Sequence, residues 1–318
     1  MKYIQYINEL IAKKTAATEG LVLYGQNIAA GSHLSGLTKG LKVGKGGLII
    51  NATNSENTLA GLGFGMMLNN VSSIFLMKQL DFLLLGIDPI VHSYNFARRK
   101  NPAASFTIVA IVSDLGWHGL QSSFNNFGDM CSIARIPGFT VMSKAEAEEI
   151  INHHLVSPGF RIIGVSQRVF GQEILDLPPT FVNREKTLFQ YPTVHPARGK
   201  KAATIACFNL SLPYGLKLQN SLKEKGIGAS LFSVTSVTPI DWDKIIADVK
   251  KTKNLVIIDD SKSENLSCDN LLAAMLEKCK MDKHIVVKRE IKGNDWLFPN
   301  LDELIIDYDS IVKKLIKS

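Results

Sequence analysis

Cysteine is scarce in this sequence of 318 residues. The four cysteines lie far apart and form no CxxC pair, and no group of histidines has the spacing of metal ligands. A disulfide framework and a zinc site are therefore disfavoured, and reduced thiols in a cytoplasmic protein are the expectation. The four residues are Cys131, Cys207, Cys268 and Cys279.

Long hydrophobic runs are also missing. The most apolar stretch, residues 71–90, is interrupted by charged and polar side chains, so it cannot cross a bilayer. The first 14 residues have the pattern of an amphipathic helix, and Glu9 interrupts them before the apolar core of a secretory signal forms. We therefore expect no membrane association.

Basic residues exceed acidic ones without forming a long cluster. There are 36 Lys and Arg against 29 Asp and Glu, a formal charge of +7, but the densest basic runs are two or three residues long. They have no interleaved aromatic residues, so we interpret them as solvated faces and expect no nucleic-acid partner. The glycine patterns GxGxxG and GxxxxGK[ST] do not occur, which disfavours a Rossmann dinucleotide site and a P-loop.

Short apolar segments that alternate with helix-like segments dominate the rest of the chain. This alternation predicts an α/β fold of two domains, each with a mostly parallel sheet flanked by helices. Four prolines and little periodicity mark the middle of the chain. We therefore expect a first domain over 1–180, a linker over 181–200 and a second domain over 201–318. The predicted strands are 20–24, 47–51, 73–77, 107–112, 139–142, 161–165, 203–207, 229–234, 255–258 and 284–287, and a long helix is predicted over 81–98.

Ligands of open parallel sheets bind beyond the carboxyl ends of the strands, so the loops that follow strands 20–24, 47–51 and 107–112 are the candidate site. Glu56 lies in the second of these loops, at the start of a small, glycine-rich helix with Ser55 as its expected N-cap. A carboxylate there is commonly a partner of the free helix amides. In an apolar cleft it would instead gain proton affinity and share a proton with a ligand nitrogen.

Five segments together resemble a known family. They are similar to the beta subunit of the thiamine diphosphate-dependent first component of 2-oxoacid dehydrogenase complexes, and to the pyrimidine-binding and C-terminal domains of transketolase. The similarity extends from Val22 to the last helix, and the order and spacing of the segments are more specific than any one of them. The segments are NATNSENTLAGLGFGMML, MKQLDFLLLGIDPIVHSYNFARRK, IARIPGFTVMSKAEAEEI, LFSVTSVTPIDWDKI and KNLVIIDDS.

The resemblance implies thiamine diphosphate as the cofactor and assigns two residues to it. Glu56 matches the family glutamate that shares a proton with the aminopyrimidine ring and so favours the imino tautomer, whose nitrogen removes the thiazolium proton. The cofactor then supplies the carbon–carbon chemistry. Phe82 matches the second aromatic of a family motif that stacks on the aminopyrimidine; ordinary core packing is the alternative.

The chain departs from the family pattern at three positions. Gln26 stands where the family has an acid near the cofactor, so it can hydrogen-bond but carries no charge. The substrate-facing Gln-His-Ser of the third loop is absent, with Ser122 or Asn125 in its neighbourhood. His118 is the candidate catalytic substitute, or else a loop or interface residue. The first aromatic of the stacking motif is Gln79. Cofactor activation is therefore expected to be retained and substrate handling altered.

One absence points to a partner chain. The family holds Mg²⁺ and the diphosphate with a Gly-Asp-Gly motif followed by an asparagine, and no Gly-Asp-Gly occurs here. A hard cation needs such oxygen ligands. The resemblance therefore implies that an alpha-type subunit supplies the Mg²⁺ and diphosphate site, in an α2β2 heterotetramer whose interfaces use apolar helices of this chain.

Three functions follow from these observations. The first is a beta-type subunit of an enzyme that decarboxylates a 2-oxoacid, or cleaves a ketose, and transfers the acyl or ketol unit. The second is the stand-alone C-terminal half of a transketolase-like transferase in a specialised sugar or secondary pathway. The third is a catalytically silent subunit that binds a partner, which the missing histidine and Gln26 favour and the retained Glu56 disfavours.

Overall fold

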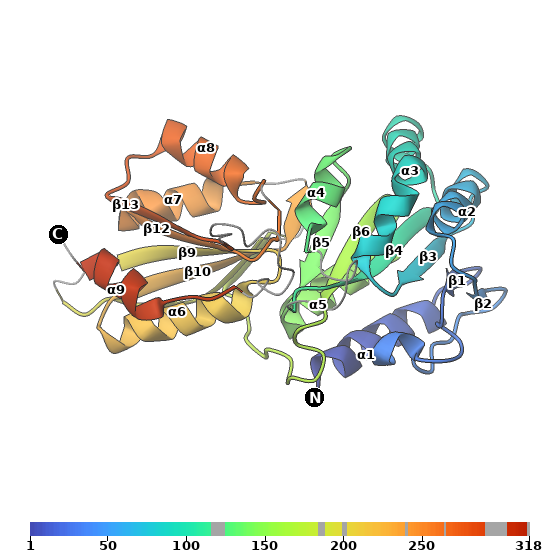
Figure 1. Ribbon diagram of the computed structural model, residues 1–318, viewed down its shortest axis with the longest axis horizontal. Helices are drawn as coiled ribbons and strands as arrows, with labels where there is room; N and C mark the ends of the chain where they lie inside the picture. Colours follow the sequence, from blue (N-terminus) through green and yellow to red (C-terminus); the bar gives the residue numbers. More distant parts are fainter. Residues whose placement is uncertain are drawn as a thin grey trace, which may run out of the picture. The chain divides into compact units, whose positions relative to one another are not determined.

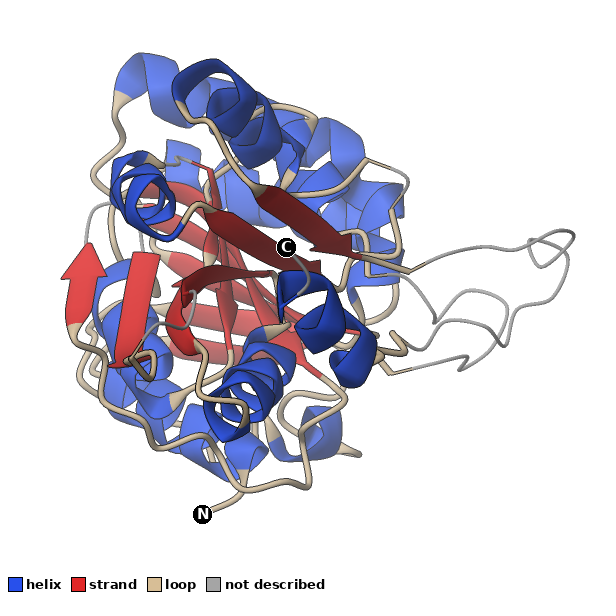
Figure 2. Ribbon diagram, turned by 90° about the vertical axis from the view of Figure 1, so that its left-hand side faces the viewer, coloured by secondary structure: helices blue, strands red, loops and turns tan. Residues whose placement is uncertain are grey.

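The computed structural model describes residues 1–115, 125–183, 188–198, 202–238, 241–263, 265–289 and 304–316. The chain divides into two compact units, Met1–Asp176 and Leu177–Ser318. Each unit is a sheet with helices on both sides (Figures 1 and 2). Both sheets are mostly parallel, so the predicted α/β fold class is confirmed.

The first unit contains strands in the spatial order β5-β6-β4-β3-β1-β2. These strands pair in parallel, with helices α2 and α3 on one face and α1 and α5 on the other (Figure 1). The strands are β1 (Val22–Gly25), β2 (Leu48–Asn51), β3 (Ser73–Met77), β4 (Ser105–Val112), β5 (Gly138–Val141) and β6 (Gly159–Ser166). The helices are α1 (Tyr3–Ala16), η1 (His33–Gly36), α2 (Glu56–Leu68), η2 (Leu80–Gly86), α3 (Ile87–Lys100), α4 (Phe127–Ser132) and α5 (Lys144–His154), of which η1 and η2 are 3₁₀ helices.

The second unit has a six-stranded sheet in the order β13-β12-β9-β10-β8-β7. Its central strands are parallel, whereas β8 pairs antiparallel with β10 and β7. The strands of the unit are β7 (Phe181–Asn183), β8 (Leu188–Val194), β9 (Ala202–Phe208), β10 (Gly228–Val234), β11 (Ser236–Thr238), β12 (Asn254–Asp259) and β13 (Lys283–Val287). The helices are α6 (Leu212–Glu224), α7 (Asp243–Thr252), α8 (Asp269–Lys278) and α9 (Tyr308–Ile316).

The expected linker over 181–200 is wrong for most of its length, because β7 and β8 lie within it and belong to the second sheet. The prolines that favoured a linker are accommodated at an irregularity of this sheet. Pro192 lies inside β8, where the pairing with β10 shifts register between Leu231 and Ala229. Proline cannot donate a ladder hydrogen bond, so a strand holds it at a bulge or an open edge.

The predicted long helix over 81–98 is also wrong, because the segment divides into η2 and α3. Pro89 explains the break. It has no N–H to donate to the carbonyl four residues earlier, so an α-helix cannot continue through this point from Leu85. The break matters because Phe82 lies on η2.

Apolar packing holds the helices on the second sheet. Ile245 and Val249 of α7 and Leu271 and Met275 of α8 pack in one buried cluster with the side chains of β9, β10 and β12. No helix in the described ranges is both long and apolar enough to span a lipid bilayer. All four cysteines are free thiols.

Candidate functional site

The carboxyl ends of β1, β2 and β3 lie at one edge of the first sheet. β1 pairs in parallel with both neighbours, and Gly25, its last residue, is opposite Asn51, the last residue of β2. The Ala52 amide continues this ladder by donating to the Gly25 carbonyl at 2.9 Å. Three chain segments that are distant in sequence therefore leave the sheet together, and they carry Gln26, Glu56 and Phe82.

Gly25 allows the backbone at the end of β1 to lie very close to β3 at this edge. Its φ is +153°, a conformation that side chains rarely adopt, and a Cβ there would lie 2.2 Å from the Leu76 carbonyl oxygen. Only glycine fits such a close backbone approach. Beyond it, the Asn51 side-chain oxygen accepts hydrogen bonds from the Ile28 and Ala29 amides at 2.9 and 3.3 Å, which fixes the loop after β1.

Glu56 is the first residue of α2. Ser55 is at the N-cap position, as predicted, but its hydroxyl donates to Thr58 Oγ1 at 2.8 Å and makes no capping bond to a helix amide. The Glu56 side chain is half-buried, and within the described residues its carboxylate has no hydrogen-bond or ion-pair partner. A half-buried carboxylate without a partner is available to a group from outside the chain.

Phe82 lies on η2, which packs against the first turn of α2. Gly86 at the end of η2 makes this contact close, because a Cβ there would lie 3.1 Å from the Glu56 carbonyl oxygen and 3.2 Å from Ala60 Cβ. Phe82 is half-buried, whereas its neighbours Asp81 and Leu83 are fully buried. Its ring stacks on no other ring in the described part of the chain.

Gln26 follows β1 directly and is also half-buried. Within the ranges that the structure describes, its amide makes no hydrogen bond. The structure therefore brings a carboxylate, an aromatic ring and an amide to the same edge of one sheet, each with exposed surface and none engaged by the rest of the described chain. Such a set can bind a planar, nitrogen-containing ring through stacking and hydrogen bonds.

The loop after β4 begins with an ion pair that sequence reasoning missed. The Asp114 side chain is fully buried and lies 3.3 Å from Arg168 Nε. It accepts hydrogen bonds from the Ser166 hydroxyl at 2.5 Å and the Arg168 amide at 2.8 Å. The position of Asp114 just after a buried strand was the available signal. His118 and Ser122 lie outside the described residues, and Asn125 is buried.

A second polar cluster lies at the carboxyl end of β12. Asp259 and Asp260, at and just after the end of β12, are both fully buried. Asp259 accepts hydrogen bonds from the Asn209 side chain at 3.1 Å and the Cys268 amide at 3.0 Å, and from the Ser261 hydroxyl and amide. Burial raises the pKa of the Asp259 carboxyl, and the hydrogen bonds from Ser261 and Cys268 oppose that rise. These bonds join the end of β9, the end of β12 and the start of α8. We therefore interpret the cluster as one that stabilises the second unit.

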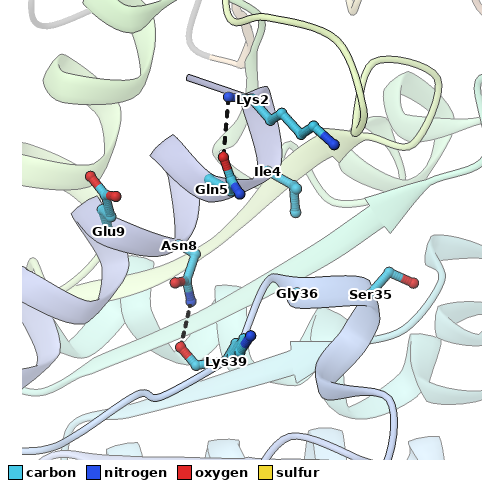
Figure 3. A pocket seen from close by; sticks show the side chains of 8 residues that line it. All are labelled: Lys2, Ile4, Gln5, Asn8, Glu9, Ser35, Gly36 and Lys39. Carbon is cyan, nitrogen blue, oxygen red and sulfur yellow. Dashed lines mark hydrogen bonds between the residues drawn. The ribbon is translucent and has the colours of Figure 1, made fainter.

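A separate cavity of about 500 Å³ lies between α1 and η1 (Figure 3). Asn8 closes one side of it by donating hydrogen bonds to the Leu37 and Lys39 carbonyls. The other polar side chains around it are exposed and of both charge signs, so it is an open, hydrated depression. Its lining contains none of the predicted site residues; it consists of Lys2, Ile4, Gln5, Asn8, Glu9, Ser35, Gly36 and Lys39. Among the described residues, no three His, Cys, Asp or Glu side chains are grouped as metal ligands.

The two mostly parallel sheets give the chain a fold similar to that of solved transketolase structures. Residues 193–289 match the family model of the transketolase C-terminal domain. A solved structure described as a split gene transketolase, inactive beta4 tetramer, is similar to this chain with a TM-score of 0.62 and 13% identity. The alignment covers 98% of this chain and 96% of that chain. The transketolase structure from Campylobacter jejuni is similar with a TM-score of 0.65 and 10% identity, and the alignment covers 92% of this chain and 42% of that chain.

Two curated proteins that are similar to this chain are beta subunits. The chain is 22% identical over 312 residues to the pyruvate dehydrogenase E1 component subunit beta-1 of Arabidopsis thaliana, which covers 94% of this chain and 84% of that protein. It is 22% identical over 326 residues to subunit beta of the same component from Rhizobium meliloti, covering 98% and 68%. The protein is therefore related to pyruvate dehydrogenase beta subunits over most of its length, and to transketolase.

Proposed function

We propose that this chain is the beta-type subunit of a two-chain, thiamine diphosphate-dependent enzyme. The observation that carries the proposal is the edge formed by β1, β2 and β3. There the side chains of Glu56, Phe82 and Gln26 are half-buried, and within the described residues they make no hydrogen bond, ion pair or ring contact. The relationship to pyruvate dehydrogenase beta subunits supports it independently. When bound, the cofactor supplies the carbanion chemistry that side chains cannot perform.

The roles of the three residues follow from their chemistry. Glu56 would share a proton with a ring nitrogen of the aminopyrimidine, because its carboxylate has no partner among the described residues. Phe82 offers one face of its ring for stacking. Gln26 can donate or accept a hydrogen bond but cannot balance a charge. Together they would hold the aminopyrimidine and exclude water from it.

The partner would be an alpha-type chain that holds the diphosphate and Mg²⁺, in an α2β2 heterotetramer. Exposed apolar residues near the candidate edge support this proposal. Leu48 and Ile50 of β2 are 58% and 41% exposed, and Leu85 of η2 is 60% exposed. On α2, Leu62 is 43% exposed. The transketolase chain from Campylobacter jejuni is more than twice as long as the part that this chain covers.

The reaction would cleave a 2-oxoacid with decarboxylation, or a ketose, and transfer the acyl or ketol unit. His118 is our candidate for assisting that transfer, since the loop lacks the histidine that the family resemblance predicts. A transketolase-like transferase in a specialised pathway is the second candidate, and the relationship to transketolase structures favours it. A silent partner-binding subunit is the third.

The cofactor role of Glu56 is tested with the E56Q variant, reconstituted with an alpha-type chain encoded beside it. Titration calorimetry with thiamine diphosphate and Mg²⁺ should show tight binding only to the pair of chains. E56Q should lower kcat by at least about 100-fold, because proton transfer by a positioned side chain contributes that much or more. The control is E19Q, an exposed carboxylate beyond α1 without a polar partner in the described residues, which should leave kcat within twofold.

The outcomes of these assays separate the three candidate functions. Undiminished turnover by E56Q would overturn the proton-sharing role. Release of CO₂ from 2-oxoacids with reduction of a dye acceptor supports the dehydrogenase-type enzyme, whereas transfer from a ketose to an aldose without CO₂ supports the transferase. Binding of the cofactor to neither the chain nor the pair would leave the silent subunit as the function. H118A should lower the rate of acyl or ketol transfer more than tenfold if His118 assists it, and a rate within a few-fold would remove His118 from the mechanism.

A further inference from the structure

The amino ends of the strands in the second unit form a strongly basic surface. Parallel strands joined by helices return every helix C-terminus to the same edge of the sheet. Here that edge comprises residues 197–198, 223–228, 250–254, 277–283 and 313–316, which we call the basic edge. The Lys and Arg of the basic edge are Arg198, Lys223, Lys225, Lys250, Lys251, Lys253, Lys278, Lys280, Lys283, Lys313 and Lys314.

Hydrogen bonds show that these segments are neighbours. The Ala197 amide donates to the Gly226 carbonyl at 2.8 Å, and the Asp282 amide donates to the Lys253 carbonyl at 2.7 Å. The Lys283 ammonium group donates to the Lys314 carbonyl at 2.6 Å, which joins the start of β13 to the last turn of α9. Helix α9 also lies beside α6 (Figure 1). The basic residues are scattered in the sequence and gathered by the fold.

The basic edge accounts for the net charge of the whole protein. It holds eleven Lys and Arg against three acidic residues, an excess of eight positive charges, whereas the formal charge of the entire chain is +7. The three acidic residues are Glu224, Glu277 and Asp282. All the basic residues except Lys283 are exposed, and within the described residues the exposed ones form no ion pair with a carboxylate. Asp248, one turn further into α7, accepts hydrogen bonds from Thr204 and Ser230 and is directed inward.

We propose that the basic edge is a docking surface for an acidic protein partner. One exposed apolar side chain, Ile316 at 50% exposure, lies within it, and Leu276, at 74% exposure, directly precedes its 277–283 segment; both can contribute contacts that salt does not screen. Its extent also fits. Four strands at about 4.8 Å spacing between two helix layers give an area on the order of 600 Å², close to one side of a standard protein–protein interface.

The composition favours a protein over a nucleic acid or a membrane. Ten of the eleven basic residues are lysines, whereas phosphate recognition favours the planar, bidentate guanidinium of arginine. The basic edge contains no Phe, Tyr or Trp, the residues that stack on bases or anchor proteins in the headgroup layer. Opposite potentials on two proteins speed their association and give specificity, so a surface with an excess of eight positive charges is complementary to an acidic protein. The inference concerns the second unit alone and is independent of the proposed catalytic function.

The test uses the full-length chain and three probes at 150 mM NaCl. The first probe is a fluorescein-labelled 21-residue helical peptide of Glu and Ala with Leu at every third or fourth position. The second is a 20-base-pair DNA duplex, and the third is a vesicle of 70% phosphatidylcholine and 30% phosphatidylglycerol. We expect the peptide to bind at least tenfold more tightly than the DNA or the vesicle, with an affinity that falls as salt rises.

Variants locate the binding on the surface. The K250E/K278E/K313E variant changes one lysine on each of three helices and should weaken peptide binding at least tenfold. The control, K39E/K42E/K45E, changes the total charge equally through exposed lysines of the first unit and should stay within twofold of wild type. If the first variant unfolds, which circular dichroism would reveal, the corresponding Lys→Gln triple variant replaces it. Equal loss in the control, tighter binding of DNA or vesicles, or no peptide binding would each overturn the proposal.

Discussion

Three glycines of α2 should respond to alanine substitution with opposite signs. Gly63 faces the core, where an added Cβ would lie 2.2 Å from Phe106 Cε2 and 2.3 Å from the Tyr24 hydroxyl oxygen. At Gly61 and Gly65 an added Cβ would have no atom within 4 Å. All three have ordinary helical backbone, so the helix itself favours alanine at each position by about 1 kcal/mol. Only the packing distinguishes them.

The magnitudes follow from these distances. G61A and G65A should each raise the free energy of unfolding by up to about 1 kcal/mol, since nothing opposes the gain in helix propensity. G63A forces two buried aromatic rings to move, and overpacking of this kind costs about 1–3 kcal/mol, so its net effect should be destabilising. In a unit of this size, 1 kcal/mol corresponds to a Tm change of about 2–4 °C.

The assay is urea and thermal unfolding of the isolated full-length chain, followed by circular dichroism. A stability of G63A equal to that of G61A would refute the packing described for α2. So would destabilisation of the isolated chain by G61A or G65A. The same variants test the proposed partner chain: if a partner's backbone approaches the open side of α2, G61A and G65A should weaken assembly at least tenfold while stabilising the free chain.

Further predictions concern two buried ionisable groups. Burial lowers the pKa of Arg161 to about 10, so its charge opposes folding by about 3 kcal/mol at neutral pH. R161M should therefore raise the free energy of unfolding at pH 7 by about 1 kcal/mol, after the loss of hydrogen bonds to Thr107 Oγ1 and the Pro158 carbonyl. This gain should shrink as pH rises through 10, and a less stable R161M at pH 7 would refute the argument. At Asp259, D259N should cost about 1–3 kcal/mol, because an amide nitrogen would then face backbone donors. The pKa of Asp259 is raised, so its contribution to stability is complete below its usual value of 3.8 and lost as pH rises through the folded-state pKa. Urea unfolding of wild type and D259N should therefore differ most in acid, and a difference that grows toward alkaline pH would contradict this sign.

Elements with a regular hydrophobic pattern were predictable from the sequence, and irregular ones were not. The buried parallel strands were predictable because segments such as 107–112 are apolar on both faces and too short for a buried helix. The strands inside 181–200 were not, because an antiparallel strand that holds Pro192 at a register shift has the local composition of a loop. The division at Gly86 and Pro89 could have been predicted, since proline within a helical pattern marks a boundary.

The candidate site was predictable to the level of its loops. Gln26 and Glu56 follow strands whose loops the carboxyl-edge rule for parallel sheets assigned to the site, whereas Phe82 follows strand 73–77 and was assigned by the family resemblance. The ion pair of Asp114 with Arg168 was not predictable, because 54 residues separate its members and only the pairing of β4 with β6 makes them neighbours. The role of His118 stays a prediction.

The sequence by itself determined the alternation of strands and helices, the fold class and the residue types available for chemistry, because these depend on local composition and periodicity. Only the tertiary structure decided which of those residues are neighbours. The lysines of the basic edge illustrate the difference: they occur in short, separate runs along the sequence, and the parallel topology of the second sheet collects them at one end. Charge density and burial are properties of three-dimensional proximity, so they emerge only when the strands pair.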